Sequence, residues 1–315
     1  MAATTGSRRL FHPGELDVQR RAGVSADAAR LEGMLAAAHL DGGAASFLAQ
    51  RQFAAVTARD AEGRLWTSPL LGPAGFLRAH GSILEVHATF PAADPLAAMP
   101  AGQQVGLIAI EFAIRRRFRV NGTGSGVSGH GLTIEADQGF GNCPSYIQRR
   151  TLTRLEDSSP VVQGQADVAG GPRGGSALTD QARSLIRSAD TFFLGTLDPG
   201  RGVDTSHKGG LPGFVRVEDD ELWWPDYAGN NMFNSLGNIT VNPEASMLFI
   251  DFATGGTLHL SGTAELQWIA PGSAGDDGAT GRRIRFRPSA VVTGPGLRIR
   301  SDSVDPSTDN PRLKD

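Results

Sequence analysis

The stretch Ser68-Pro-Leu-Leu-Gly-Pro-Ala-Gly-Phe-Leu-Arg78 recurs later in the chain as Ser206-His-Lys-Gly-Gly-Leu-Pro-Gly-Phe-Val-Arg216. A serine, two glycines, a phenylalanine and an arginine stay in register between the two. Three more blocks repeat in the same order with an offset of about 140 residues: Phe53–Thr57 with Phe192–Thr196, Leu107–Phe112 with Met247–Phe252, and Val120–Thr123 with Leu260–Thr263. Four ordered blocks with one period predict two copies of one domain.

The repeated blocks have the pattern of short strands. Apolar or alternating stretches such as 105–112, 246–252 and 257–266 are separated by turn signals at Glu62-Gly63, Asn121-Gly122 and Gly255-Gly256. A helical pattern precedes each copy, over Ala26–His39 with Ser25 as N-cap and over Ala182–Ser188 after Thr179-Asp180. We therefore expect a mainly β protein with flanking helices, in which a small antiparallel barrel occurs twice.

Composition shifts divide the chain into three parts. Residues 1–156 are expected to form the N-terminal helix and the first barrel, and residues 178–315 the second barrel. The Gly/Ser/Pro-rich stretch 157–177 between them has the composition of an exposed linker. The loop 270–281 and the polar tail 301–315, expected to be frayed, carry no evident chemistry.

Overall composition excludes several protein classes. A formal net charge of -3 on 315 residues lacks the basic excess of a non-specific nucleic-acid binder. The single cysteine, Cys143, cannot form an internal disulfide. The longest apolar run, 105–110, is far shorter than the roughly 18 residues of a membrane-spanning helix. The sequence therefore predicts a soluble cytoplasmic protein that binds neither nucleic acid nor membrane.

The first candidate site lies where the two copies differ. Pro69, Leu70 and Leu71 in the first copy are replaced by His207, Lys208 and Gly209 in the second, directly after Ser206. A hydroxyl, an imidazole and an ammonium beside glycines offer donors next to a backbone that a ligand can approach, which suits an anion. The alternative interpretation is a polar hairpin turn with a solvated lysine.

A second candidate is the asparagine cluster Asn230, Asn231 and Asn234. If a helical turn begins at Asn231, then Asn231 and Asn234 share a face, and amide side chains there suit ribose or ribityl hydroxyls. The alternative is a group of capping and turn residues, because Asn-Asn and Gly-Asn favour turns.

A third candidate is the segment 141–150 at the end of the first copy. Tyr146, Arg149 and Arg150 are placed where they could reach an anion held by the partner barrel, whereas Cys143 is interpreted as a packed residue because no charged neighbour in sequence would activate it. The run 115–119 is typical of a solvated strand face. Arg116 and Arg119 are weaker candidates for the phosphate side of the cleft.

Other familiar site types are missing from the sequence. It contains no dinucleotide-binding glycine motif, no phosphate-binding Walker loop and no nucleophile elbow. The seven histidines show no metal-ligand spacing, so no metal is expected. If the chain is an enzyme, a cofactor is expected to supply the chemistry.

The motifs together resemble one family. Residues 204–217, 225–243 and 141–150, with Phe11-His-Pro-Gly-Glu15 as a less specific match, resemble the pyridoxamine 5'-phosphate oxidase-related FMN-binding split-barrel proteins, and in particular their larger bacterial members with two tandem barrels. The resemblance implies that two barrels pack face to face with FMN in the groove between them. Here the repeat implies that one chain supplies both barrels as an intramolecular pseudo-dimer.

The resemblance also implies roles for the candidate residues. The strand with Ser206, His207, Lys208 and Gly209 would lie along the flavin, and the asparagine segment would hold the phosphate or ribityl chain. One flavin per chain is expected, because the first copy lacks the polar trio. The arginine-rich C-terminal signature of true pyridoxamine phosphate oxidases is not recognisable in 288–315.

The expected function is that of an FMN-binding oxidoreductase that moves hydride or electrons from a reduced donor such as NAD(P)H to oxygen or a small organic acceptor. No catalytic side chain is identified. The alternatives are a non-catalytic flavin carrier and a split barrel that uses haem or a deazaflavin coenzyme. The expected partners are a small-molecule substrate and an electron donor, and the chain is expected to act as a pseudo-dimeric monomer or a homodimer.

Overall fold

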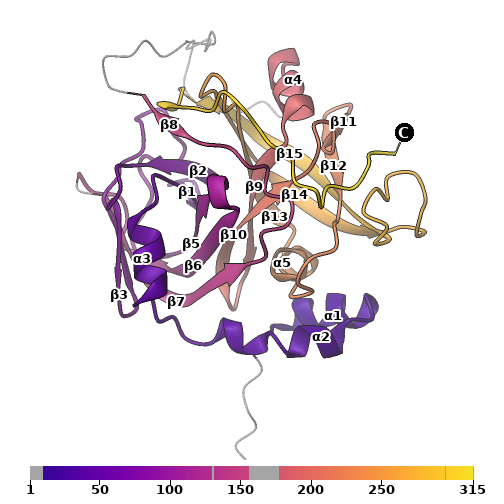
Figure 1. Cartoon of the computed structure of the whole chain (residues 1–315), viewed down its shortest axis with the longest axis horizontal. Coiled ribbons are helices and arrows are strands. Elements are labelled where there is room, and N and C mark those ends of the chain that lie inside the picture. Colours follow the sequence, from indigo (N-terminus) through magenta and orange to yellow (C-terminus); the bar gives the residue numbers. More distant parts are fainter. Residues whose placement is uncertain (1–9, 130, 156–176, 295, 315) are drawn as a thin grey trace, which may run out of the picture.

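The computed structural model describes residues 10–129, 131–155, 177–294 and 296–314, and it consists of two similar halves with few helices (Figure 1). The elements of the first half are α1 (Pro13–Arg21), α2 (Ser25–Ala29), η1 (Glu32–Leu35), α3 (Gly43–Ala49), β1 (Phe53–Arg59), β2 (Leu65–Leu71), β3 (Leu77–His80), β4 (Ile83–Val86), β5 (Gln103–Glu111), η2 (Phe112–Ile114), β6 (Arg116–Gly124), β7 (Leu132–Asn142) and β8 (Thr153–Arg154). Those of the second are α4 (Asp180–Ser188), β9 (Thr191–Asp198), β10 (Gly202–Gly209), β11 (Arg216–Glu218), β12 (Glu221–Pro225), α5 (Asn234–Val241), β13 (Glu244–Ile250), β14 (Thr257–Trp268), β15 (Arg282–Gly294) and β16 (Ile299–Arg300).

The two halves have the same sheet topology. The strand order is β2-β1-β5-β6-β7-β4-β3 in the first seven-stranded sheet and β10-β9-β13-β14-β15-β12-β11 in the second. The neighbouring strands pair antiparallel, from β1 with β2 to β14 with β15. The predicted fold class, two tandem split barrels of mainly β structure, is therefore confirmed.

The repeated stretch that follows β2 and β10 forms the same tight turn in both halves. A Cβ on Gly72 would lie 2.3 Å from the Phe76 side chain, and one on Gly210 would lie 2.5 Å from that of Phe214. Gly75 and Gly213 have φ of 91° and 90°, which glycine adopts without strain. These glycines let each phenylalanine turn back into the core of its own barrel.

The halves pack face to face through a buried interface. Each barrel has its own apolar core, and a third apolar cluster that includes Phe53, Ile108, Phe193 and Leu248 joins residues from both. Hydroxyl groups cross the same interface: Thr67 and Ser246 are 2.7 Å apart, and Thr205 Oγ1 donates to the carbonyl of Gly106 at 2.7 Å. The chain is thus an intramolecular pseudo-dimer.

The helix prediction was correct for the second half and wrong for the first. The helix of the second half, α4, begins at Asp180, two residues before the predicted start, and Thr179 caps it by accepting from Ala182 N. The segment 26–39 is not one helix, because α2 ends at Ala29, a 3₁₀ turn follows, and Ser25 lies inside α2 instead of capping it. The counterpart of α4 is α3, which directly precedes β1, and the sequence reading missed α1 and α3.

Two other expectations need correction. Asn121-Gly122 is not a turn but a β-bulge inside β6, matched by a bulge at Ser261/Gly262 in β14. The C-terminal tail is not frayed: Arg149 pairs with Asp305 through backbone hydrogen bonds, and Asn310 bonds to Gln148. The first barrel offers arginine and amide partners that the local sequence of the tail does not reveal.

The expected linker lies almost wholly outside the described residues, so the predicted domain boundaries remain predictions. None of the helices that the structure describes has the length and apolar character to span a bilayer.

Candidate functional site

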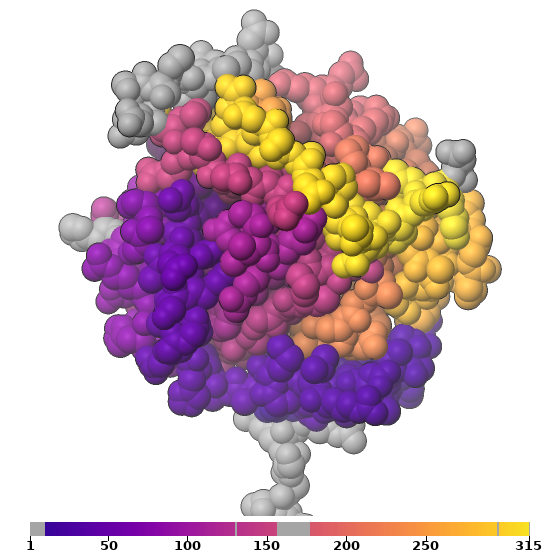
Figure 2. Space-filling model, viewed as in Figure 1, coloured from indigo at the N-terminus to yellow at the C-terminus, as the bar shows by residue number. Residues whose placement is uncertain are grey.

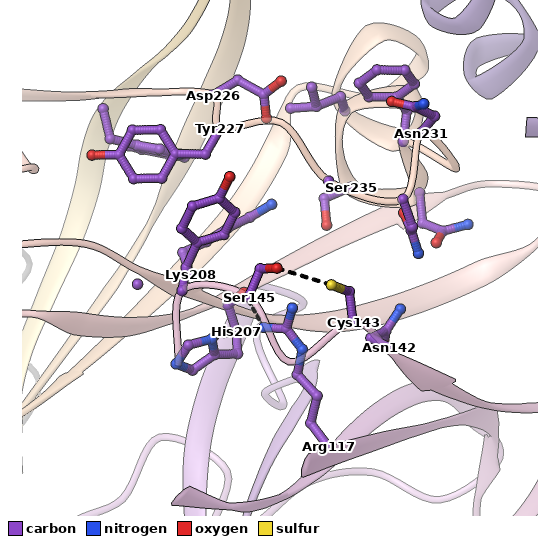
Figure 3. A pocket seen from close by; sticks show the side chains of 18 of the residues that line it. Arg117, Asn142, Cys143, Ser145, His207, Lys208, Asp226, Tyr227, Asn231 and Ser235 are labelled. Atoms are coloured by element: carbon purple, nitrogen blue, oxygen red, sulfur yellow. Dashed lines mark hydrogen bonds between the residues drawn. The ribbon is translucent and has the colours of Figure 1, made fainter. Parts of the chain in front are cut away.

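A groove runs between the two halves where β6 and the 142–146 loop of the first barrel face β10, residues 224–231 and α5 of the second (Figure 3). It holds about 900 Å³ of empty space, with the open solvent at its mouth included, and aromatic residues line it beside polar ones. Such a mixed lining of aromatic and polar groups is typical of small-molecule sites. The polar lining residues are Arg117, Arg119, Asn142, Cys143, Ser145, Tyr146, His207, Lys208, Asp226, Tyr227, Asn230, Asn231, Asn234 and Ser235.

Two arginines of β6 cross from the first barrel to the second. They are two positions apart, so the strand directs both to one face. Arg119 forms a buried ion pair with Asp204 at 2.8 Å, and Asn121 donates to the same carboxylate at 3.2 Å. Arg117 Nη1 lies 2.8 Å from His207 Nδ1 and donates to the carbonyl of His207 at 3.3 Å. Burial and the nearby Arg119 charge lower the pKa of Arg117 to about 9.

The contact with Arg117 fixes the state of His207. A guanidinium can only donate, so His207 Nδ1 accepts and the ring proton sits on Nε2. Burial, then the charges of Arg117, Arg150, Lys208 and Arg119, lower the pKa of His207 well below its ordinary value. The ring is therefore neutral and packs edge-on against Phe112 and Phe193.

Lys208 brings a third cation to the groove from the end of β10. Burial lowers its pKa to about 8, while Asp226 opposes the shift. Asp226 is already paired with Arg282, whose Nε donates to it at 2.9 Å. Lys208 therefore has a charged neighbour but no ion pair among the described residues.

Aromatic rings form one side of the groove. The rings of Tyr146 and Tyr227, one from each half, have centroids 5.0 Å apart. Tyr146 Oη donates to the carbonyl of Ala228 at 2.7 Å. Burial, with Asp277 nearby, raises the pKa of Tyr227, so its hydroxyl keeps its proton.

The asparagine cluster is a turn followed by a helix start, not a shared helical face. Asn231 and Phe233 have φ of 62° and 60°, in the left-handed region, and α5 begins only at Asn234. Asn230 Oδ1 accepts from Met232 N at 3.2 Å, which stabilises the turn. No helical turn begins at Asn231, so the structure has the turn arrangement that the sequence offered as the alternative, and all three asparagines line the groove.

Several buried polar atoms of the lining have no hydrogen-bond partner in the described part of the chain. They are Arg117 Nε, Arg119 Nε, Asn142 Oδ1, His207 Nε2 and Tyr227 Oη. Buried polar groups are nearly always paired, so orphan atoms that cluster in one groove fit a polar ligand. In the same described ranges, no group of three or more histidine, cysteine or acidic side chains could hold a metal ion.

The structure brings seven of the ten predicted site residues to the groove: Tyr146, His207, Lys208, Gly209, Asn230, Asn231 and Asn234. Ser206 lies behind it, fully buried, with its hydroxyl 3.0 Å from that of Ser235. Gly209 packs so closely that a Cβ would lie 2.0 Å from the carbonyl oxygen of Tyr146.

Two predicted arginines lie elsewhere. Arg116 is exposed, with its guanidinium 5.5 Å from the centre of the Phe47 ring, and Arg149 forms an ion pair with Asp305 at 2.7 Å. Arg116 falls on the opposite face of β6 from Arg117 and Arg119, because side chains alternate along a strand.

Sequence reasoning missed Arg117, Asn142, Ser145, Asp226, Tyr227 and Ser235. The alternation of Arg117 with Arg119 was the available signal, since it marks one strand face. Cys143 is not a packed residue: it is exposed at the groove, with Sγ 3.0 Å from Ser145 Oγ.

Comparison with protein families matches residues 178–273 to pyridoxamine 5'-phosphate oxidase. The match takes in the second barrel from α4 to β14, with Lys208 and the asparagine cluster, and confirms the family resemblance there. No curated protein matches the chain.

Among solved structures, HupZ from Group A Streptococcus is similar at 16% identity over 38% of this chain and 97% of its own, with a TM-score of 0.31. A putative pyridoxamine 5'-phosphate oxidase from Lactobacillus delbrueckii is 14% identical over 38% of this chain and 97% of its own, with a TM-score of 0.31. HutZ, the heme storage protein from Vibrio cholerae, is 16% identical over 39% of this chain and 99% of its own, with a TM-score of 0.29.

Proposed function

We propose, from the premise that this tandem split-barrel chain is related to pyridoxamine 5'-phosphate oxidase, that it binds one FMN in the groove between its barrels. We further propose that it is an oxidoreductase that passes hydride or electrons from a reduced donor, such as NAD(P)H, to oxygen or a small organic acceptor. FMN, when bound, would supply the redox chemistry.

The observation that carries the proposal is the charge inside the groove. Arg119 and Asp226 are neutralised by Asp204 and Arg282, but Arg117 and Lys208 have no ion-pair partner among the described residues. Two unpaired cations in a partly buried groove favour an anionic ligand, and a phosphate accepts charge-assisted hydrogen bonds from both residue types.

The remaining lining fits the other parts of a flavin nucleotide. Asn230, Asn231, Asn234 and Ser235 offer amide and hydroxyl groups for the ribityl chain. The Tyr146–Tyr227 pair offers apolar surface for a flat ring, and the orphan atoms of Arg119 and Asn142 offer a donor and an acceptor.

The protein's own groups contribute binding and proton control. Lys208 Nζ keeps its proton at pH 7, since the pKa is about 8, and so adds positive charge beside the ligand. Arg117 holds His207 in its neutral Nε2–H form, which leaves no lone pair on Nε2 for a metal. This state of His207 favours flavin over a haem that would need it as an axial ligand.

The test is to titrate the purified full chain with FMN, FAD, riboflavin, haem and a deazaflavin coenzyme, and to follow visible absorbance and flavin fluorescence. We expect saturation with one FMN per chain and donor oxidation by the FMN-loaded protein with NADH or NADPH. FMN binding without donor oxidation would support a flavin carrier. Failure to bind any flavin would overturn the proposal.

Arg117→Ala and Arg116→Ala form a matched pair for this test. Both remove an arginine from β6, but only Arg117 faces the groove. Loss of one charge-assisted bond of about 1.5 to 3 kcal/mol should weaken FMN binding by roughly ten- to a hundredfold in R117A. R116A should bind as the parent does, and equal affinities in both variants would remove Arg117 from the site.

A further inference from the structure

The sequence motif Phe11-His-Pro-Gly-Glu15 belongs to neither barrel. It forms the start of α1, which lies beneath α5 (Figure 1). In the space-filling view the N-terminal segment runs along the lower side of both halves (Figure 2). The motif therefore places a separate helix against the element that carries Asn234 and Ser235.

The contact between the two helices is a close backbone approach. A Cβ on Gly14 would lie 2.3 Å from the carbonyl oxygen of Gly237, and a Cβ on Gly237 would lie 2.6 Å from Glu15 N. His12 caps α1 by accepting from Gly14 N at 3.2 Å, and its Nε2 lies 3.0 Å from Asn238 Oδ1. Only glycines fit at this crossing, so α1 is held in one position.

This docking brings Glu15 to the edge of the groove. Glu15 is 3% exposed, and its Oε2 accepts from His12 N at 2.8 Å. Its other oxygen, Oε1, accepts from Asn234 Nδ2, on a residue that lines the groove. Four residues further along α1, Gln19 Nε2 donates to the carbonyl of Met232 at 3.2 Å. Helix α1 thus holds both the left-handed turn and the first residue of α5.

We propose that Glu15 is a positioning residue of the groove: its carboxylate on α1 orients the Asn234 amide for the ligand, and does so fully only when ionised. The proposal rests on the proposed flavin site for its consequence, but not for its geometry. An ionised carboxylate is a stronger acceptor than a neutral one, so protonation weakens the hold on Asn234.

The surroundings place this ionisation in an accessible range of pH. The groups that face Glu15 are His12 at the N-cap of α1, Asn234 on α5, Asp204 on β10 and Arg201 in the β9–β10 turn. His12 itself faces Asp198 at 3.6 Å. Burial, with Asp204 adding to it, raises the pKa of Glu15 to about 7. Glu15 is therefore mostly neutral at pH 6 and mostly ionised at pH 8.

The test compares FMN affinity from pH 5.5 to 8.5 in the parent, Glu15→Gln and Asp17→Asn. Asp17 is on the same helix but pairs with Arg20 at the surface, so D17N is the matched control. We expect E15Q to bind about fivefold more weakly than the parent at pH 8 and nearly as well at pH 6, because a neutral side chain replaces the carboxylate. The FMN phosphate and Lys208 titrate in both the parent and E15Q. Their contributions therefore cancel in the ratio of the two FMN dissociation constants. A ratio that stays constant with pH would overturn the proposal.

A second readout needs no ligand. The side-chain amide NMR signal of Asn234, assigned through Asn234→Ala, should titrate with a midpoint near 7 in the parent and D17N and lose that step in E15Q. A step in the parent together with no FMN binding would support the positioning role and reject the flavin site. No step in the parent would overturn the positioning role even if FMN binds.

Discussion

The groove at β6, β10 and α5 has a mirrored position in the pseudo-dimer, at β14, β2 and residues 91–99, and the two are chemically opposite. Where β10 has Lys208, β2 has Leu70, which is 1% exposed. Where β6 has Arg119, β14 has His259, whose Nδ1 lies 3.0 Å from the carbonyl of Thr67. The mirrored position therefore has no arginine or lysine at these two points, and the His259 imidazole is hydrogen-bonded to the backbone of β2.

The third element differs as well. In the second half, α5 follows the groove and carries Asn234 and Ser235. In the first half, the described residues 91–99 form turns without a helix, and Phe90, Leu96 and Met99 pack into the barrel core. Ser68 bonds to Asp94 at 2.7 Å, as Ser206 contacts Ser235 at 3.0 Å, so both positions keep a buried polar pair behind the third element. One scaffold thus supports an open polar groove on one side and a closed apolar filling on the other.

The largest expected difference between the two positions is in the cost of removing the β6 or β14 side chain. Arg119→Ala leaves the Asp204 carboxylate, 4% exposed, without its cation, which should lower the free energy of unfolding by about 3 to 5 kcal/mol. His259→Ala removes a neutral, buried side chain with two hydrogen bonds and leaves a cavity, and about 2 to 3 kcal/mol is expected. Urea unfolding of both variants measures this, and equal losses would show that the Arg119–Asp204 pair is not the special feature of the open side.

The next effect concerns α1, which packs on the helix that the mirrored side lacks. The folded chain keeps the Glu15 proton up to a pKa of about 7, whereas the ordinary value is 4.5. The folded state therefore binds more protons between these values, and its stability falls as pH rises through that window. Relative to Glu15→Gln, the parent should lose about 3 kcal/mol between pH 4.5 and 7 and stay level above.

The difference between the two proteins is the quantity to measure, because the histidines act in the opposite direction. The lowered pKa values of His12, His207 and His259 make the folded state lose stability as pH falls below about 6.5. Thermal unfolding of the parent and E15Q across pH 4 to 8 gives the difference profile. A flat profile would contradict the buried, proton-holding state of Glu15.

The duplication was readable from the sequence, because Gly72, Gly75 and Phe76 recur at equivalent positions and these residues build the same turn twice. The side of the pseudo-dimer with the groove was also readable, from the replacement of Leu70 by Lys208. The side-chain contacts between the two halves could not be predicted from the sequence. The contacts of Arg117 with His207 and of Arg119 with Asp204 join residues about 90 positions apart across an interface.

The role of α1 was hidden for a different physical reason. Its start matched a family motif, but the contacts of Glu15 with Asn234 and of Gly14 with Gly237 span more than 200 residues. The sequence left a helix start and a turn open at Asn231, because local propensity cannot distinguish the two when tertiary contacts at Met232 and Asn234 decide between them.

The smallest expected effect tests the exchange between the two positions directly. Lys208→Leu gives the open groove the residue that the mirrored position has. Leu70 shows that the fold accepts a leucine near the end of this strand, because it holds the equivalent place in β2. We expect an intact fold and FMN binding weaker by about tenfold, which corresponds to roughly 1.4 kcal/mol for one lost cation at a half-buried site. The reverse change, Leu70→Lys, should lower stability by burying a charge without adding a second FMN per chain, because Phe90 and Leu96 still fill the space. Calorimetric titration gives affinity and stoichiometry for both variants. Parental affinity in K208L would exclude Lys208 from the site, and two FMN per chain in L70K would show that this one lysine, and not the apolar filling, separates the two sides.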